Sequence, residues 1–299
     1  MDKFLKKYKN NKTLNFFDML LYRLKENDIT SYGAGLAFFL ILSIFPFLIA
    51  LINIVNFLDI INVDNILNLM QYFPNSVKEI VKNFFIELNI TSSTELLSIS
   101  VLAGLFSASS AINKLIKFIN NSYGFEDNRN FFLNRVLAII FTLLFIFMIL
   151  LLIVSQVFGK IIFYKFISIF HIDSKIIYFL WIIANSLIPL IYLFLTFSAV
   201  YRFAPCPPKN DKIKYKTVIP GSLFSTFAVI IATVIFAFYV NNFGKYSITY
   251  GSLGGIIVFL IWLFLLSTLI LIGAEINIVL YSIKKGNYEE NRKDTIIYK

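Results

Sequence analysis

The chain has 299 residues, of which 58% are hydrophobic and 17% aromatic, while only 15% are charged. Soluble domains carry about 25% charged residues, and the mean hydropathy here is +0.77. This composition excludes a soluble domain with an ordinary polar surface, a disordered chain and a disulfide-rich secreted module. We therefore predict an all-α, polytopic integral membrane protein that forms one membrane domain over residues 1–299.

The first predicted element is an amphipathic helix in the N-terminal segment 1–28. One face of residues 14–24 is apolar at helical spacing, formed by Leu14, Phe17, Leu21 and Leu24. Such a helix lies at the inner membrane interface, and the stub of a soluble domain is the alternative. The basic region and the apolar run after it are too long for a cleavable signal peptide, so we expect the first span to be retained.

Six uncharged stretches are candidates to cross about 30 Å of hydrocarbon. The shortest, Leu96–Asn113, is rich in Ser, Gly and Ala, which suit close helix packing in lipid. The other five are longer and uninterrupted: Ile29–Leu58, Val136–Gly159, Ile176–Tyr201, Thr217–Gly244 and Tyr246–Ala274. We predict six transmembrane helices.

The basic residues are divided unequally between the two sides that six spans define. One side holds 21 Lys and Arg, in residues 1–28, 114–135, 202–216 and the tail 284–299. The other side holds 6, in residues 59–95, 160–175 and Lys245. Because cytoplasmic loops carry the excess of Lys and Arg, both termini are predicted to be cytoplasmic.

The predicted outer loop 59–95 contains a second amphipathic helix. Ser76 and Glu79 fit a capping box, and the apolar positions that follow have helical spacing: Val77, Ile80, Val81, Phe84, Phe85 and Leu88. This helix would cover the outer ends of the spans or rest on the lipid. The aromatic segment Ile161–Phe170 is a candidate interface anchor at the other outer corner.

Glu275 is the ionisable residue that the pattern places inside the membrane. Eight uncharged residues separate it from Lys284, which puts it roughly 13 Å inside that lysine along a helix. A charge at mid-bilayer costs about 2.5–3.5 kcal/mol on insertion scales. In one interpretation Glu275 lines a polar path with Thr268 and Asn277. In the other it forms a buried pair that orients helices, with Arg202 or Arg135 as its partner.

The outer turn before the last span is the second candidate site. Glycines there permit unusual backbone conformations and close approach, and aromatic and hydroxyl groups supply polar edges. The candidate residues are Tyr250, Gly251, Ser252, Gly254 and Gly255. A tight outer turn and a substrate-facing re-entrant loop are both compatible with this pattern. Pro46 interrupts the first span and is a candidate hinge, with simple packing as the alternative.

Signatures of soluble catalytic sites are missing from the sequence. It contains no GxSxG, HExxH or P-loop motif. With one Cys and one His, we expect no metal site, and we expect no cofactor, no nucleic-acid partner and no enzymatic activity. Metal-dependent hydrolysis of RNA would need several convergent acids or histidines.

Several segments together resemble the YihY/BrkB family of bacterial inner-membrane proteins. They are YGAGLAFFLILSIFPFLIAL in the first span, the turn IxNSYGFED, Tyr201-Arg202 with Pro205, Val218-Ile-Pro220-Gly221, and NFGKYSITYGSLGGIIVFLIWLF followed by LIGAEIN. The loop Pro205-Cys206-Pro207-Pro208 and the low alanine content depart from typical members. The resemblance implies six spans and a place in the inner membrane. Members have carried the label ribonuclease BN, generally regarded as a misassignment; others are linked to serum resistance and envelope biogenesis, and lipid movement has been suggested.

Two functions follow as hypotheses. The first is a transporter or translocase of lipids or envelope precursors, with membrane lipids as partners and a path lined by Glu275, Asn277, Thr268 and the outer turn. The second is a non-transporting scaffold that binds envelope-assembly proteins through the exposed face of Val77–Leu88 and the basic loop Lys209–Lys216.

Overall fold

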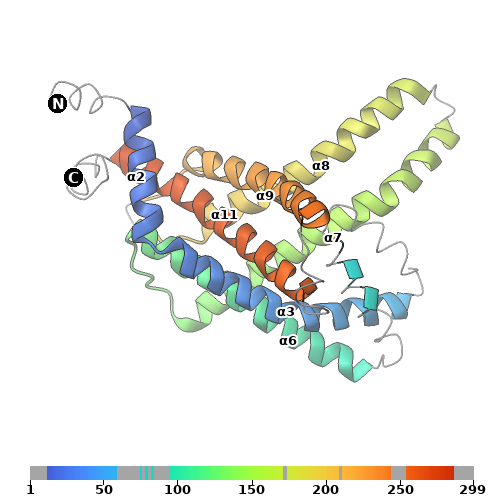
Figure 1. Cartoon of the computed structure of the whole chain (residues 1–299), viewed down its shortest axis with the longest axis horizontal. Helices are drawn as coiled ribbons and strands as arrows, with labels where there is room; N and C mark the ends of the chain where they lie inside the picture. Colours follow the sequence, from blue (N-terminus) through green and yellow to red (C-terminus); the bar gives the residue numbers. More distant parts are fainter. Residues whose placement is uncertain are drawn as a thin grey trace.

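The structure is a computed structural model that describes residues 12–58, 75, 78–79, 82–83, 94–170, 174–208, 211–243 and 254–285. Within these ranges the side chains of residues 12, 45, 47–58, 94–98, 100, 152–170, 174–186 and 243 are not described. The long helices, labelled as in Figure 1, are α2 (Lys12–Glu26), α3 (Ile29–Leu58), α6 (Thr94–Tyr123), α7 (Phe131–Phe170), α8 (Ser174–Phe203), α9 (Tyr215–Phe243) and α11 (Gly254–Lys285). The described part of the chain has no strand, so the predicted all-α class is confirmed.

The long helices follow the uncharged stretches of the sequence. A lipid environment offers no hydrogen-bond partner to the backbone, so an apolar segment satisfies its own polar groups by forming a helix. Helix α3 has the bounds predicted for the first span, whereas α6 continues past Asn113 to Tyr123. Segment Ile161–Phe170, expected as a separate interface anchor, forms the last turns of α7.

Four stretches of the described residues are long and apolar enough to cross a membrane: Val101–Tyr123, Phe131–Leu151, Tyr215–Asn242 and Gly254–Lys285. The bent pair Thr13–Glu26 and Ile29–Ile44 would make a fifth, and Leu187–Phe203 is a shorter apolar helix. The six-span count and the side on which the termini lie therefore remain predictions.

Helices α2 and α3 meet at an angle of 59°. Asp28 forms the corner, with a φ of 43°, a left-handed conformation that Asp tolerates better than most residues. Its Oδ1 accepts a hydrogen bond from the backbone N–H of Ser31 at 3.4 Å, which is the pattern of a helix N-cap. The same residue thus ends α2 and starts α3.

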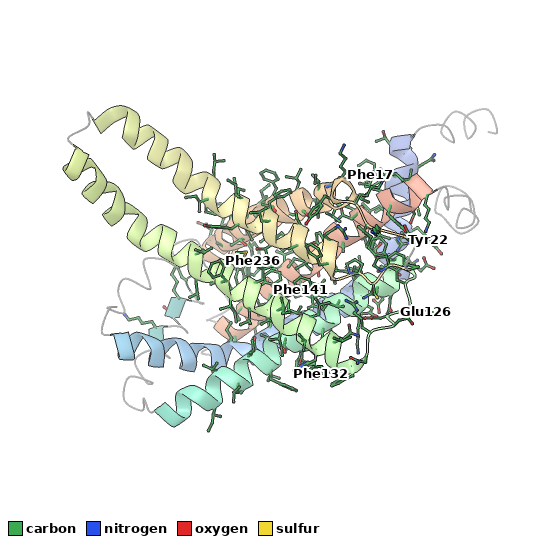
Figure 2. All side chains as sticks on the ribbon, turned by 180° about the vertical axis from the view of Figure 1, so that it is seen from behind. Phe17, Tyr22, Glu126, Phe132, Phe141 and Phe236 are labelled. Atoms are coloured by element: carbon green, nitrogen blue, oxygen red, sulfur yellow. The ribbon has the colours of Figure 1, made fainter. Side chains whose placement is uncertain are left out.

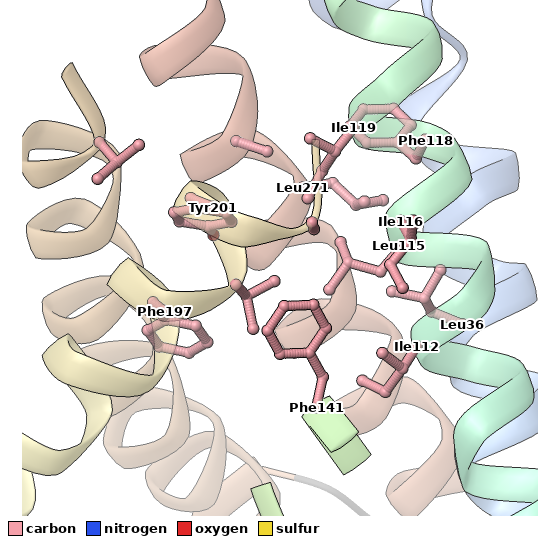
Figure 3. Close-up of a cluster of buried hydrophobic side chains, with 14 of the residues drawn as sticks. Leu36, Ile112, Leu115, Ile116, Phe118, Ile119, Phe141, Phe197, Tyr201 and Leu271 are labelled. Carbon is pink, nitrogen blue, oxygen red and sulfur yellow. The ribbon is translucent and has the colours of Figure 1, made fainter. Parts of the chain in front are cut away.

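Helix α11 is the central element and packs against α9, α3, α2 and α6, while α3 lies along α6 (Figure 1). The outer part of the α7–α8 hairpin, at the upper right of Figure 1, extends away from the other helices. The main apolar core lies where α3, α6, α7, α8 and α11 converge, and Figure 3 shows its members Leu36, Leu115, Phe141, Phe197 and Leu271.

Large apolar side chains also cover the outer surface of the long helices. Examples are Phe38 on α3, Phe106 on α6, Phe147 on α7, Leu195 on α8 and Ile235 on α9, each at least half exposed. So much exposed apolar surface is expected for helices whose outer faces contact lipid.

Helices α9 and α11 approach each other at Gly221 and Gly273. A Cβ added at Gly221 would overlap the Gly273 carbonyl oxygen and lie 2.5 Å from Asn277 Cγ. A Cβ added at Gly273 would overlap Ser225 Oγ and lie 2.8 Å from Tyr201 Oη. Small residues at a helix crossing let two backbones approach closely in lipid, so this crossing requires glycine on both helices.

We expect Gly273→Ala to lower the stability of the protein by about 1–3 kcal/mol, because the added methyl group has no space between α9 and α11. The measurement is thermal unfolding of the purified protein in detergent. Leu223→Ala, at an exposed position of α9, is the control and should melt close to wild type. Adding Ser225→Ala to Gly273→Ala removes the nearest clashing atom and should recover part of the loss; no recovery would contradict this account.

Candidate functional site

The carboxylate of Glu275 is the centre of a buried polar cluster. Glu275 lies on α11 with none of its surface exposed. Its Oε2 accepts a hydrogen bond from Arg23 Nε at 2.8 Å, and its Oε1 accepts one from Asn27 Nδ2 at 2.7 Å. Each carboxylate oxygen of Glu275 therefore accepts a hydrogen bond, and both donors lie at or just after the C-terminal end of α2.

The sequence of α2 explains how these two side chains reach Glu275. Arg23 and Asn27 are four residues apart and so lie on one face of a helix. One turn earlier on that face, Met19 and Leu20 are buried against Val279 of α11. Phe17 and Leu21 point away and are more than half exposed. Helix α2 thus docks on α11 through both polar and apolar side chains, while Phe17 and Leu21 stay exposed. Its place at the membrane interface remains a prediction.

The end of α6 completes the cluster. Arg23 Nη2 donates a hydrogen bond to the Ser122 carbonyl oxygen. The ring of Tyr123 stacks on Phe125 with centroids 4.9 Å apart and meets Tyr281 of α11 edge-on at 5.2 Å. Helix α6 ends at Gly124, whose φ of 69° is typical of a glycine that closes a helix C-terminus. Helices α2, α6 and α11 therefore meet around one ion pair.

The buried-pair interpretation named Arg202 or Arg135 as the partner of Glu275, whereas the structure pairs Glu275 with Arg23. The Arg135 guanidinium bonds Ser110 Oγ at 3.2 Å and the Phe106 carbonyl oxygen at 2.9 Å. The Arg202 guanidinium lies 5.5 Å from the ring centroids of Phe203 and Tyr215. Arg23 takes their place because α2 packs against α11, a docking that the apolar pattern of α2 alone did not reveal.

Asn277 and Thr268, the other residues of the expected path, face different helices. Asn277 Oδ1 accepts a hydrogen bond from the Gly221 backbone N–H at 2.7 Å, while its buried Nδ2 has no hydrogen-bond partner among the described residues. Thr268 Oγ1 bonds the Phe264 carbonyl oxygen at 2.8 Å and lies beside Gly33 of α3. Among the described contacts, no hydrogen bond joins either residue to Glu275, so the structure does not gather the three into one site.

The outer-turn candidates fall only partly within the described residues. Gly254 and Gly255 form the first turn of α11, not the outer turn in which the sequence placed them. Tyr250, Gly251 and Ser252 lie outside the described residues. The expected helix Val77–Leu88 is also largely outside them, although the nearby Asn75 backbone N–H donates to Asn241 Oδ1 at 3.2 Å. Pro46 lies inside α3, and its role as a hinge remains a prediction.

A second polar network ties the connecting loops together near the end of α6. The buried Asn120 accepts a hydrogen bond from the Cys206 backbone N–H at 2.7 Å through Oδ1. Arg129 pairs with Asp127 at 2.7 Å and donates to the Ala204 carbonyl oxygen at 2.8 Å. Partial burial raises the pKa of Asp127, but the hydrogen bonds and charge of Arg129 outweigh this and hold it below its usual value.

Asp211 attaches the other end of the loop that follows α8 to helix α11. It accepts hydrogen bonds from Lys285 Nζ and Tyr281 Oη, both on the last turns of α11. The hydrogen bond from Lys285, followed by that from Tyr281, holds the pKa of the Asp211 carboxyl below its usual value. The loop is therefore anchored at both ends by charged groups.

Sequence reasoning missed the residues that build these contacts. Arg23 and Asn27 were not singled out, and Tyr201 was named only as part of the family resemblance. Tyr201 Oη donates to the Ile270 carbonyl oxygen at 2.6 Å and lies 2.7 Å from Ser225 Oγ. One signal was available. Most of the new contacts fall within the family-like segments IxNSYGFED, Tyr201-Arg202, Val218–Gly221 and LIGAEIN, where polar and small residues interrupt otherwise apolar helices.

These observations define a helical, multi-pass membrane protein with a buried ion pair between its first and last described helices. The chain matches the family described as Virulence factor BrkB over residues 20–295. It belongs to this family, as the resemblance found in the sequence implied.

Curated relatives agree with this assignment. The chain is 35% identical to the ribonuclease-like protein YfkH of Bacillus subtilis over 272 residues, which cover 91% of this chain and 97% of that protein. It is 23% identical to the UPF0761 membrane protein MS0032 of Mannheimia succiniciproducens over 88% of both chains. No solved structure matches the chain. The described residues contain no group of three or more His, Cys, Asp or Glu side chains that could hold a metal ion, so the ribonuclease name finds no support in them.

We expect Arg23→Met to destabilise the protein by about 3–5 kcal/mol, because it leaves the buried Glu275 charge without its cation. The double variant Arg23→Met/Glu275→Leu removes both charges and should be closer to wild type than Arg23→Met alone. Thermal unfolding of the purified variants measures both effects. Costs that simply add in the double variant would show that the two side chains do not act as a pair.

We expect Asp127→Asn to lower stability by about 1–2 kcal/mol at neutral pH, since it weakens charge-assisted hydrogen bonds from Arg129. A carboxyl whose pKa is lowered by folding contributes stability above its unfolded pKa of about 3.9 and loses that contribution as the pH falls through the folded value. The difference in melting temperature between wild type and Asp127→Asn should therefore be constant from pH 8 to about pH 5 and shrink only below about pH 4. A difference that instead shrinks between pH 8 and 6 would contradict this.

Proposed function

We propose that the protein is a transporter that moves lipids or lipid-linked envelope precursors across the membrane. The observation that carries this proposal is the fully buried Glu275, whose cationic partner Arg23 belongs to a separate amphipathic helix. Ionisable groups inside membrane proteins most often mark pathways or relays. An ion pair contributed by a peripheral helix can also open without unfolding the helices behind it.

The attachment of α2 supports a role as a gate. Helix α2 is joined to α3 through the single corner at Asp28. Its described contacts with α11 include the Arg23–Glu275 pair, the Asn27 bond and a small apolar cluster around Val279. In the proposed mechanism, rotation at Asp28 separates Arg23 from Glu275 and exposes both charges. A cargo head group that replaces one partner stabilises this open state.

The lipid-like nature of the cargo is inferred from the surface of the helices and from the family resemblance. The outer faces of α3, α6, α7, α8 and α9 are apolar, so an amphiphile can approach the protein from within the membrane. The YihY/BrkB family has been associated with envelope biogenesis and lipid movement. The bacterial inner membrane, with both termini in the cytoplasm, is the location we propose.

A scaffold for envelope-assembly proteins is the second candidate, and the loop after α8 is the observation in its favour. Asp211 holds the loop to Lys285 of α11, while Lys212, Lys214 and Lys216 remain exposed. A basic segment held in place in this way is suited to bind an acidic partner.

Transport is tested with the full-length protein in liposomes, by following the transbilayer movement of labelled phospholipids. Wild type is compared with Glu275→Gln and with Arg23→Gln/Glu275→Gln, which removes both charges and keeps hydrogen-bonding groups in place. Glu126→Gln, at an exposed position of the loop after α6, is the control. We expect movement with wild type and the control, and at least a tenfold slower rate with the double variant.

Each variant is first shown to be folded by its thermal unfolding. A folded double variant that moves lipid at the wild-type rate would remove the ion pair from the mechanism. If wild type moves no lipid but crosslinks to a partner through Lys212 or Lys214, the scaffold function is favoured instead.

A further inference from the structure

Three cations lie on the outward side of α6 and α7: Lys114, Lys117 and Arg135. The ion pairs of the described residues are Arg23–Glu275, Arg129–Asp127 and Lys285–Asp211. None of them includes Lys114, Lys117 or Arg135. Lys117 is exposed, and Lys114 and Arg135 are half-buried. Basic residues next to an apolar membrane-facing surface attract anionic groups at the membrane, so a ligand of opposite charge is the expected complement.

The three cations flank the same stretch of α6. At 100° per residue, Phe106, Ser110, Lys114 and Lys117 fall within roughly 80° of the helix surface. Arg135 reaches this face from α7, where its Nη1 donates to Ser110 Oγ at 3.2 Å and its guanidinium carbon lies 4.0 Å from the centroid of the Phe106 ring. These contacts fix the guanidinium over the same face and leave part of its surface open.

Helix α3 provides space for the Lys114 ammonium group. Lys114 Nζ lies 5.3 Å from the centroid of the Phe39 ring. A Cβ added at Gly35 would lie 2.9 Å from Nζ and 3.4 Å from Cδ of the same lysine. Because Gly35 has no side chain, the lysine can lie against the backbone of α3. Lys114 is therefore held on the side of α6 that faces α3, and Arg135 on the side that faces α7.

The surroundings of the cations are apolar and exposed. Leu102 is 69% and Phe106 66% exposed on α6, and Phe131 and Phe132 at the start of α7 are 84% and 73% exposed. Figure 2 shows Phe132 at the edge of the molecule. A soluble anion such as a nucleic acid would leave these side chains uncovered. An anionic phospholipid places its phosphate on the cations and its acyl chains on the apolar residues.

We propose that Lys114, Lys117 and Arg135 form a binding site for the phosphate group of an anionic phospholipid, with its acyl chains along Leu102 and Phe106. The site lies on the outer surface of α6 and α7 and is separate from the Arg23–Glu275 pair. It does not depend on transport. It would hold one lipid at the same end of the bundle as α2, where α6 ends and α7 begins (Figure 1).

The test is native mass spectrometry of the full-length protein released from detergent with equal amounts of phosphatidylglycerol and phosphatidylcholine. A basic residue near a membrane surface contributes about 1 kcal/mol, or about a fivefold change in affinity. We expect wild type to prefer phosphatidylglycerol. Lys114→Gln and Arg135→Gln should each reduce the preference about fivefold, and the double variant should reduce it by about 25-fold.

Two controls separate this site from non-specific binding. Lys25→Gln/Lys284→Gln removes the same charge from exposed positions of α2 and α11 and should keep the preference, as should the charge-conserving variant Lys114→Arg/Arg135→Lys. Excess inorganic phosphate should not displace the lipid, because the acyl chains contribute to binding.

The proposal is overturned if wild type binds the two lipids equally, if Lys114→Gln and Arg135→Gln leave the preference unchanged, or if inorganic phosphate competes fully. The single variants and the wild-type comparison decide the question even where the double variant does not fold.

Discussion

A carboxylate without any exposed surface has to be neutralised inside the protein, and this requirement organises one end of the fold. Glu275 accepts hydrogen bonds from Arg23 of α2 and from Asn27 just after that helix. Arg23 also donates to the Ser122 carbonyl oxygen at the end of α6. Beside these polar contacts, Met19 and Leu20 of α2 pack against Val279 of α11. Buried ion pairs add little net stability, but the loss of one partner is expensive. The main effect of the pair is therefore to fix the position of α2 on α11, and its contribution to the overall stability of the protein is small.

The polar contacts around this pair and the glycine crossing of α9 and α11 hold helices together for the same physical reason. In lipid, apolar side chains gain little by leaving their surroundings, so helices are held together by close backbone approach and by hydrogen bonds. Gly221 and Gly273 supply the first, and Asn277 and Tyr201 supply the second within the same crossing. The networks at Asn120 and Asp211 do the same for the loops.

Sequence reasoning found the helices better than it found their neighbours. Runs of uncharged residues predict helices because, in lipid, the backbone N–H and C=O groups must form hydrogen bonds with each other. The bounds of α3 agree with the prediction. The buried position of Glu275 was also foreseen from its cost. Its partner was not, since Arg23 lies 252 residues away and the apolar periodicity of α2 points to residues such as Phe17 and Leu21, which are exposed. Glycine at 254 and 255 was interpreted as turn-forming, yet packing allows both residues to begin α11.

The separation of the two charges in the chain has a consequence for biosynthesis. Arg23 leaves the ribosome first, and Glu275 follows 252 residues later, roughly 13–50 s afterwards at 5–20 residues per second. During this interval α2 has no docking surface on α11, and the exposed apolar face with Phe17 and Leu21 can hold it at the membrane surface. The last of the described helices to be synthesised thus brings the counter-charge for the first of them. An incomplete chain keeps an unpaired arginine by which a quality-control protease could distinguish it from the finished protein.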